Sequence, residues 1–312
     1  MNPEIFKGRD LLALDDFTPD EVLFVVEAAA AQKRAWIATG KGPRHDGKSV
    51  AVVLQKPSLR THMSFEMAAV RLGMHPIMMT GSNSAFSRGE SIADTARVME
   101  RYVDAIVLRT YAQSTLDELA AAAQVPVINA LSDDHHPCQG LADLLTILER
   151  CGRLDGIKLA YVGDGNNMAH TYLLAGALTG MDTRIATPAG YAPSADIVAR
   201  AQRIAEGTGA KVSVTTDARA AVEGADVVIT DTWASMGQEG EHAERVDVFV
   251  PYRVDDAMMS LADPSAIFMH CLPAHRGEEV TDSVIDGPQS VVFDEAENRL
   301  HAQKALLSLV VA

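Results

Sequence analysis

Ser58, Arg60 and Thr61 bring two hydroxyls and a guanidinium into the short segment 56–61. An apolar run at 50–54 precedes this segment and residues with helical spacing follow at 62–72, which predicts a strand, a loop and a helix. Backbone N–H groups at a helix start lack partners within the helix, so the loop can bind a compact anion such as phosphate. A capped helix start without a ligand is the alternative. The glycines and the Gly-Lys-Ser/Thr ending of a Walker A loop are absent.

Arg109, His136 and Gln139 are the next candidates. Arg109 ends an apolar run, so a strand is predicted to deliver its guanidinium at the strand end, with a surface salt bridge as the alternative. His136 and Gln139 lie three residues apart at a predicted helix start, so both can face one point. A neutral imidazole and an amide can donate to a carbonyl oxygen. A buried histidine with satisfied hydrogen bonds is the alternative for His136.

The segment 163–167, Gly-Asp-Gly-Asn-Asn, lies between another predicted strand and helix. It resembles the start of a dinucleotide-binding loop, but Met168 stands where the third glycine of that motif belongs. Nicotinamide binding is therefore disfavoured. The two asparagines suit amide contacts to a small polar ligand.

Asp231 and Cys271 each directly follow an apolar strand. A carboxylate at a strand end can accept from an ammonium group, or can simply be a solvated loop acid. Cys271 has His270 and His275 nearby and is a conceivable nucleophile, but a buried, inert thiol is the commoner case. No helix start directly follows Cys271 to favour a thiolate.

A repeated strand–loop–helix pattern positions these candidates. Strands are predicted at 50–54, 75–79, 104–109, 125–128, 158–162, 183–187, 211–215, 227–230 and 267–270. Helices are predicted at about 18–39, 62–72, 90–102, 114–123, 140–150, 168–179, 194–206, 254–261 and 296–311. The alternation predicts two α/β units with parallel sheets, joined near 152–156. Ligands of open α/β sheets bind at the carboxyl ends of strands, where every candidate lies, so one composite site is expected.

Composition limits the function further. The chain of 312 residues is long enough for two domains. Its net charge of -15 disfavours nucleic-acid and anionic-membrane surfaces, although a local pocket can still bind a small anion. The three cysteines are far apart and odd in number, which disfavours a disulfide framework or a zinc knuckle. Neither a signal-peptide core nor an apolar run of about 20 residues is present, so a cytoplasmic protein is expected.

In their order along the chain, these clusters resemble the transcarbamylase family. They are Ser58-Leu59-Arg60-Thr61, His136-Pro137-Cys138-Gln139, Asp231 with Ser235-Met236-Gly237, and His270-Cys271-Leu272-Pro273. The last two clusters and the tail 293–304 are similar to the ornithine branch and differ from the aspartate branch. The resemblance covers nearly the whole chain.

The resemblance implies transfer of a carbamoyl group from carbamoyl phosphate to the δ-amine of L-ornithine. The products would be L-citrulline and phosphate, in arginine metabolism, with no metal or organic cofactor. It also implies a fold of two doubly wound parallel-sheet domains. Residues 1–147 would bind carbamoyl phosphate, with the C-terminal helix 296–312 packing back on them, and residues 148–295 would bind ornithine. The family is typically trimeric, so a homotrimer or a multiple of trimers is expected.

Individual residue roles also follow from the resemblance. The carbamoyl phosphate-binding residues would be Ser58, Leu59, Arg60, Thr61, Arg109, His136, Gln139, Cys271, Leu272 and Arg299. The ornithine-binding residues would be Asn167, Asp231, Ser235 and Met236. The catalytic residues would be Arg60, Arg109, His136, Cys271 and Arg299. No residue is an unmistakable general base, so a phosphate oxygen is a candidate acceptor of the amine proton.

Two departures from the family pattern affect the carbamoyl phosphate site. Leu59 and His62 replace a hydroxyl residue and an arginine, which removes one hydroxyl donor but leaves the backbone N–H of residue 59. A Gln-Leu-Gly segment often precedes Arg88-Gly89-Glu90-Ser91, and its glutamine reaches a neighbouring subunit's carbamoyl phosphate. Ala85-Phe86-Ser87 stands there in this chain, so that contact is not carried over. The candidate substitutes are Ser82, Asn83, Ser84 and Ser87.

Three alternatives remain. A transcarbamylase for acetylornithine or putrescine is disfavoured by Ser235-Met236-Gly237. A catalytically silent, ligand-binding paralogue is supported only by Leu59 and the missing glutamine. A nicotinamide dehydrogenase is disfavoured by the absent third glycine.

Overall fold

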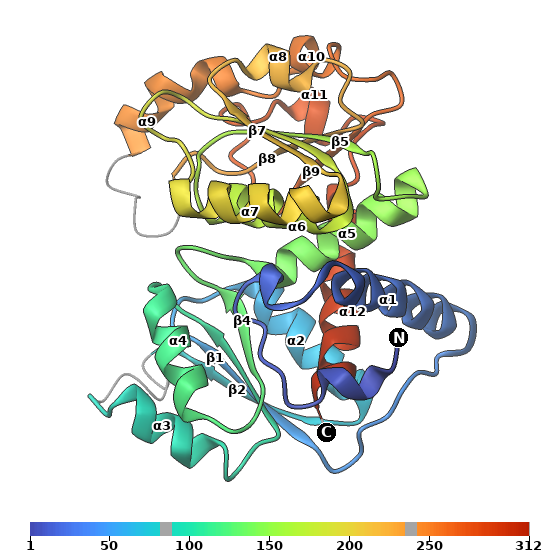
Figure 1. Ribbon diagram of the computed structural model, residues 1–312, viewed down its shortest axis with the longest axis vertical. Helices are drawn as coiled ribbons and strands as arrows, with labels where there is room; N and C mark the ends of the chain where they lie inside the picture. The colour runs from blue at the N-terminus through green and yellow to red at the C-terminus, as the bar shows by residue number, and fades with distance from the viewer. Residues whose placement is uncertain (82–88, 235–241, 312) are drawn as a thin grey trace. The chain divides into compact units, whose positions relative to one another are not determined.

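The computed structural model describes residues 1–81, 89–234 and 242–311 (Figure 1). Two compact units make up the chain. The first unit comprises Met1–Leu145 and the C-terminal residues from Glu297 onward, and the second comprises Thr146–Ala296. The division falls within α5 (Pro137–Cys151), upstream of the junction expected near 152–156.

The first unit is built on a four-stranded parallel sheet with strand order β2-β1-β3-β4. Its strands are β1 (Ser49–Leu54), β2 (His75–Thr80), β3 (Ala105–Arg109) and β4 (Val127–Leu131). The helices α3 (Ile92–Met99) and α4 (Gln113–Ala122) pack on one face through a buried apolar cluster that includes Ala96, Leu116 and Leu119.

The helices α1 (Pro19–Thr39), α2 (Leu59–Leu72) and α12 (Val292–Val310) lie on the other side of this sheet (Figure 1). Polar contacts join α12 to α1, because Gln32 Nε2 donates to Ser308 Oγ at 2.9 Å and Lys33 Nζ donates to Asn298 Oδ1 at 2.8 Å. The prediction that the C-terminal helix packs back on the N-terminal domain is therefore confirmed.

The second unit is built on a five-stranded parallel sheet with strand order β7-β6-β5-β8-β9. Its strands are β5 (Lys158–Val162), β6 (Asp182–Ala186), β7 (Lys211–Thr215), β8 (Val227–Thr230) and β9 (Ile267–His270). The helices α6 (Asn167–Thr179) and α7 (Ala195–Thr208) cover one face (Figure 1). The short helices α8 (Ala218–Val222), α10 (Asp256–Met259) and α11 (Asp282–Ile285) pack on the other face, and α9 (His242–Phe249) follows β8.

Each sheet contains a topological switch point. In the first unit, β1 lies between β2 and β3, so the connections after β1 and after β3 leave in opposite directions along the sheet. In the second unit, β5 lies between β6 and β8 in the same way. Ligand sites of doubly wound folds form at such points. The loop with Ser58 and the side chain of Arg109 lie at the first switch point, and the loops with Asn167 and Asp231 lie at the second.

Strands were predicted more accurately than helix starts. The predicted β5, β7, β8 and β9 have the observed bounds, whereas β4 was predicted two residues too early. Three helices begin three or more residues earlier than predicted: α2 at Leu59, α5 at Pro137 and α12 at Val292. The helix predicted at 254–261 is only the short α10, and α8, α9 and α11 were not predicted.

Capping explains where helices begin. The sequence Thr18-Pro19-Asp20-Glu21 is typical of a capping box. Thr18 and Glu21 form that box at the start of α1, with Glu21 N donating to Thr18 Oγ1 and Thr18 N donating to Glu21 Oε2. Short 3-10 helices occur at Pro3–Phe6, Leu14–Asp16 and Val250–Tyr252.

Among the described residues, no helix is both long enough and apolar enough to span a membrane.

Candidate active site

The first unit has a cluster of candidate residues at the start of α2. Ser58 is the N-cap residue, and its Oγ accepts a hydrogen bond from the Thr61 backbone N–H at 3.3 Å. This cap explains why the helix begins at Leu59 and why Leu59, Arg60 and Thr61 form its first turn. Arg60 makes no hydrogen bond or ion pair with any described residue, so its guanidinium is available to an anion at the helix start. The side chain of Leu59 is 72% exposed and contributes only its backbone N–H there.

His136 is buried directly before α5. Burial lowers the pKa of His136 well below its usual value, and the nearby guanidiniums of Arg299, Arg109 and Arg60 lower it further. The imidazole is therefore neutral at physiological pH, as the sequence predicted for an uncharged donor. The structure brings these three arginines close enough to act electrostatically on one imidazole.

Arg299 is the most buried arginine of this group, because it is only 2% exposed whereas Arg60 and Arg109 are half-buried, and several acceptors hold it. Its Nη1 donates to Gln139 Oε1 at 2.8 Å, and its Nη2 lies 3.4 Å from Thr61 Oγ1. In the amide orientation that satisfies both side chains, Gln303 accepts from Arg299 Nε and Nη2 at 3.1 and 3.0 Å. Gln139 in turn donates to Asp143 Oδ1 at 2.7 Å. These contacts join α2, α5 and α12 around the helix start.

Arg109 ends β3, where it pairs with Leu54 of β1. Its backbone carbonyl accepts from Gln55 N at 3.0 Å, which fixes the strand end beside the loop that leads to Ser58. Cys138 of the same motif is not a reactive thiol, because burial raises its pKa to about 12. The residues 58, 60, 61, 109, 136, 139 and 299 therefore form one cluster in the first unit.

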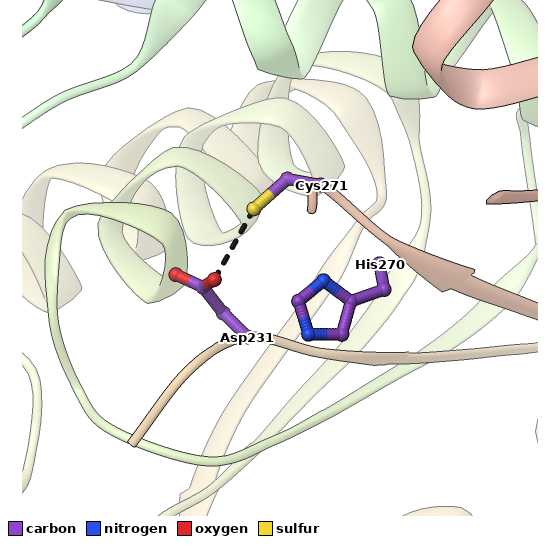
Figure 2. Close-up of side chains that lie close together, drawn as sticks. All are labelled: Asp231, His270 and Cys271. Atoms are coloured by element: carbon purple, nitrogen blue, oxygen red, sulfur yellow. Dashed lines mark hydrogen bonds between the residues drawn. The ribbon is translucent and has the colours of Figure 1, made fainter. Parts of the chain in front are cut away.

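The second unit has a cluster of its own, which is centred on Asp231 and Cys271 (Figure 2). Cys271 Sγ donates to Asp231 Oδ1 at 3.2 Å, and the same oxygen accepts from Thr232 N at 2.8 Å. Asp231 is buried and Cys271 is half-buried. The thiol faces a carboxylate, which opposes a thiolate, so the geometry supports amine binding better than thiol nucleophilic catalysis.

His270 does not act on Cys271 as a base. Its Nδ1 accepts from the Leu272 backbone N–H at 2.9 Å, and its Nε2 lies 3.1 Å from Glu279 Oε1. Glu279 is fully buried and also accepts from the His275 backbone N–H. Glu279 was missed from sequence, because nothing marks one acid of a Glu-Glu pair as a partner of a histidine nine residues earlier.

Gly165, the second glycine of the loop after β5, is explained by how this loop packs. A Cβ at Gly165 would lie 2.3 Å from the Tyr191 carbonyl oxygen, so the glycine allows the loop to pack on the chain that follows β6. Asn166 caps α6, accepting from Met168 N at 2.9 Å, and leaves Asn167 buried at the first helical position. Gly165 is therefore needed for the close approach of another segment of the chain. Its presence does not require a bound pyrophosphate.

The described residues contain two clusters of candidate metal ligands, and hydrogen bonds already engage part of each cluster. Asp231, His270 and Cys271 place donor atoms within 4.8 Å of one another, as do His275, Glu278 and Glu279. His270 uses Nδ1 to accept from Leu272 and directs Nε2 to Glu279, so its ring offers no lone pair to an ion. Glu279 Oε1 is already hydrogen-bonded to two donors.

Ser235 and Met236, and the segment Ser82–Arg88 with Ala85, lie outside the described residues. Asn167, Asp231, Cys271 and Leu272 all belong to the second unit, where the last three lie at the ends of β8 and β9.

Comparisons with known proteins identify the family of the chain. The family model for the aspartate/ornithine carbamoyltransferase carbamoyl-P binding domain matches residues 9–149, and the model for the Asp/Orn binding domain matches residues 155–310. The ornithine carbamoyltransferase of Parafrankia sp. is 58% identical over 97% of this chain and 96% of its own, and that of Acidothermus cellulolyticus is 54% identical over the same shares. The solved ornithine carbamoyltransferase of Pyrococcus furiosus covers 98% of both chains at 50% identity, with a TM-score of 0.94. The chain belongs to the aspartate/ornithine carbamoyltransferase family.

Proposed function

We propose that this chain transfers the carbamoyl group of carbamoyl phosphate to the δ-amine of L-ornithine, producing L-citrulline and phosphate. Its relatives at 50–58% identity are ornithine carbamoyltransferases over nearly their whole length. The observation that carries the assignment to this chain's own residues is the neutral, buried His136 near the guanidiniums of Arg60, Arg109 and Arg299. Such a cluster suits a substrate with a phosphate at one end and a carbonyl oxygen at the other.

Carbamoyl phosphate is bound by residues 1–147 with helix 296–312 in this proposal. The capped start of α2 receives the phosphate through the side chains of Ser58, Arg60 and Thr61 and the backbone of Leu59, and Arg109 completes the clamp. His136, Gln139 and Arg299 face the carbamoyl oxygen, which gains negative charge when the amine attacks. A preorganised donor to such an oxygen is typically worth about 3–4 kcal/mol of transition-state stabilisation.

L-Ornithine is bound by residues 148–295 in this proposal. Asn167, Ser235 and Met236 hold the amino-acid end, and Asp231, Cys271 and Leu272 contact the reacting amine. A δ-ammonium group has a reference pKa of about 10.4, so it must lose a proton before it attacks. Positioning of the two substrates and electrostatic stabilisation then account for most of the rate enhancement. The departing phosphate is a suitable acceptor for the proton.

Citrulline formation from carbamoyl phosphate and ornithine tests the proposal directly. Purified protein should form citrulline with L-ornithine and much less product with acetylornithine or putrescine. A preference for either of those amines would reassign the substrate. Absence of product with all three amines, together with ligand binding, would indicate a silent paralogue. The P. furiosus relative that is 51% identical bears the name anabolic, which supports a biosynthetic role in arginine metabolism.

A cytoplasmic homotrimer, or a multiple of trimers, is the assembly we propose. The outward face of α2 supports self-association, because Leu59, Met63, Met67 and Val70 recur at helical spacing and are each at least 41% exposed. Solvent-facing apolar stripes of this kind commonly mark protein interfaces. Light scattering of the wild-type chain and of Met63→Glu tests this: a trimeric mass that falls in the variant is expected, and a monomeric wild type would exclude the assembly.

A further inference from the structure

Arg245 forms a buried ion pair that sequence reasoning did not single out. Its Nη1 lies 2.8 Å from Asp164 Oδ2, and the two side chains are only 7% and 8% exposed. The same nitrogen donates to the Trp233 backbone carbonyl at 3.0 Å. The guanidinium carbon also lies 5.0 Å from the centre of the Tyr191 ring. One side chain of α9 therefore touches three separate segments.

These three segments follow three neighbouring strands of one sheet. Asp164 follows β5, Tyr191 follows β6 and Trp233 follows β8, and the strands are adjacent in the order β6-β5-β8. All three strands are parallel, so Arg245 joins the carboxyl ends that flank the switch point of the second unit. The close packing of Gly165 on the Tyr191 carbonyl belongs to the same junction.

Two residues assigned above to ornithine lie within these segments. Asp231 is two residues before Trp233, and Asn167 is three residues after Asp164. Thr230 Oγ1, directly before Asp231, donates to the Val162 carbonyl at 2.6 Å, so β5 and β8 are already tied together at their ends. Beyond that point, Arg245 supplies a further link between the two loops. A shift of either loop changes the distance between Asn167 and Asp231.

We propose that Arg245 is a positioning residue for the amine substrate: by joining Asp164, Tyr191 and Trp233 it sets the spacing between Asn167 and Asp231. The proposal rests on the function proposed above. Arg245 has no contact with substrate in this account and acts through the backbone of the loops that it holds. Its loss should therefore weaken ornithine binding and leave the carbamoyl phosphate cluster of the first unit unaffected.

The test is steady-state kinetics of Arg245→Met and Arg245→Lys with each substrate varied in turn. Arg245→Met should raise the KM for ornithine about tenfold or more, the loss expected when about 1.4 kcal/mol of binding is removed. The KM for carbamoyl phosphate should stay within about twofold. Arg245→Lys keeps a cation beside Asp164 and a donor for the Trp233 carbonyl, so it should recover most of the ornithine affinity.

Arg184→Met is the matched control. Arg184 of β6 also pairs with an aspartate, Asp182 at 2.9 Å, and donates to backbone carbonyls, including that of Glu223 at 2.9 Å. The Arg184→Met substitution should lower the melting temperature without changing the KM for ornithine. An unchanged ornithine KM in Arg245→Met overturns the proposal, as does a parallel change of both KM values together with kcat.

Two further outcomes separate possible failures. If Arg245→Met does not fold, Arg245→Gln serves instead, because an amide still donates to Trp233 but cannot neutralise Asp164; a wild-type ornithine KM in folded Arg245→Gln then overturns the proposal. If the wild-type chain forms no citrulline, the proposed function itself fails. If the wild type is active and the arginine variants bind ornithine normally, only the positioning role fails.

Discussion

His270 Nδ1 accepts a hydrogen bond from the backbone N–H of Leu272 at 2.9 Å. This contact holds Leu272 at a φ of 59°, in the left-handed region that a leucine rarely adopts. Such a conformation costs about 1–3 kcal/mol and persists only where its surroundings enforce it. Because Nδ1 is the acceptor, a neutral ring carries its proton on Nε2 and donates it to Glu279. Glu279 thus fixes the tautomer that holds the residue beside Cys271.

Replacing Glu279 tests whether its hydrogen bond with His270 supports the conformation of Leu272. Glu279→Ala leaves a buried imidazole N–H and the His275 N–H without their acceptor, so we expect a loss of about 2–5 kcal/mol in the free energy of unfolding. Glu279→Gln retains an oxygen at the same place and should lose much less stability and activity. Urea unfolding and citrulline assays measure both effects. If the alanine and glutamine variants have equal stability and equal activity, this role of Glu279 is contradicted.

Arg60→Ala should reduce turnover strongly while leaving the fold intact. The guanidinium lies in the first turn of α2 with no hydrogen bond or ion pair to a described residue, so its removal breaks no structural contact. The lost stabilisation of the leaving phosphate should be about 3–4 kcal/mol, or 100- to 1,000-fold in kcat. Arg71→Ala, in the last turn of the same helix, is the control and should retain activity. Near-normal kcat in Arg60→Ala would refute the assignment.

Leu59→Thr should tighten carbamoyl phosphate binding. Leu59 stands where the family motif commonly has a hydroxyl residue, and its exposed side chain offers no donor to the phosphate. A hydroxyl donor to a charged group is worth about 1.5–3 kcal/mol, so the KM for carbamoyl phosphate should fall about tenfold or more. Leu59→Val, which changes the shape without adding a hydroxyl, is the control. A KM that is the same in both variants would show that the backbone N–H suffices.

His136 should make stability depend on pH below neutrality. Burial first, and then Arg299, Arg109 and Arg60, hold the pKa of His136 well below its value in the unfolded chain. The unfolded state therefore binds a proton that the folded state does not, and stability rises with pH through this range. The contribution of the neutral His136 to the free energy of unfolding is fully present above the unfolded pKa of about 6.5. This contribution is lost progressively as the pH falls below that value.

Denaturant unfolding at pH 7.5 and pH 5.5 measures this dependence. The wild-type chain should lose about 1.4 kcal/mol more than His136→Gln between these two values, since each pH unit below the unfolded pKa costs that amount. His75→Gln, at the exposed start of β2, should show the wild-type dependence. An identical dependence in His136→Gln and the wild type would show that His136 does not carry the effect.

The sequence by itself determined the alternation of strands and helices and most of the local site elements. Apolar runs marked β5, β8 and β9 at their observed bounds, because a buried parallel strand must be apolar on both faces. The exposed edge strand β7 was also predicted at its observed bounds. Caps were readable in the same way, as Thr18 with Glu21 shows, since both partners lie within one turn. Helix starts at polar functional segments were placed too late, because residues 59–61 lack an apolar periodicity.

Only the tertiary structure decided which distant side chains complete the two clusters. Arg299 reaches Thr61 from 238 positions away, and Glu279 reaches His270 of β9 from the chain that follows that strand. Arg245 joins segments that follow three strands. Such pairings have no period and no fixed spacing in the chain. They arise because parallel strands bring their carboxyl ends to one edge of a sheet, whereas the intervening helices consume unequal lengths of sequence. A buried charge then needs whichever partner the packing brings near it.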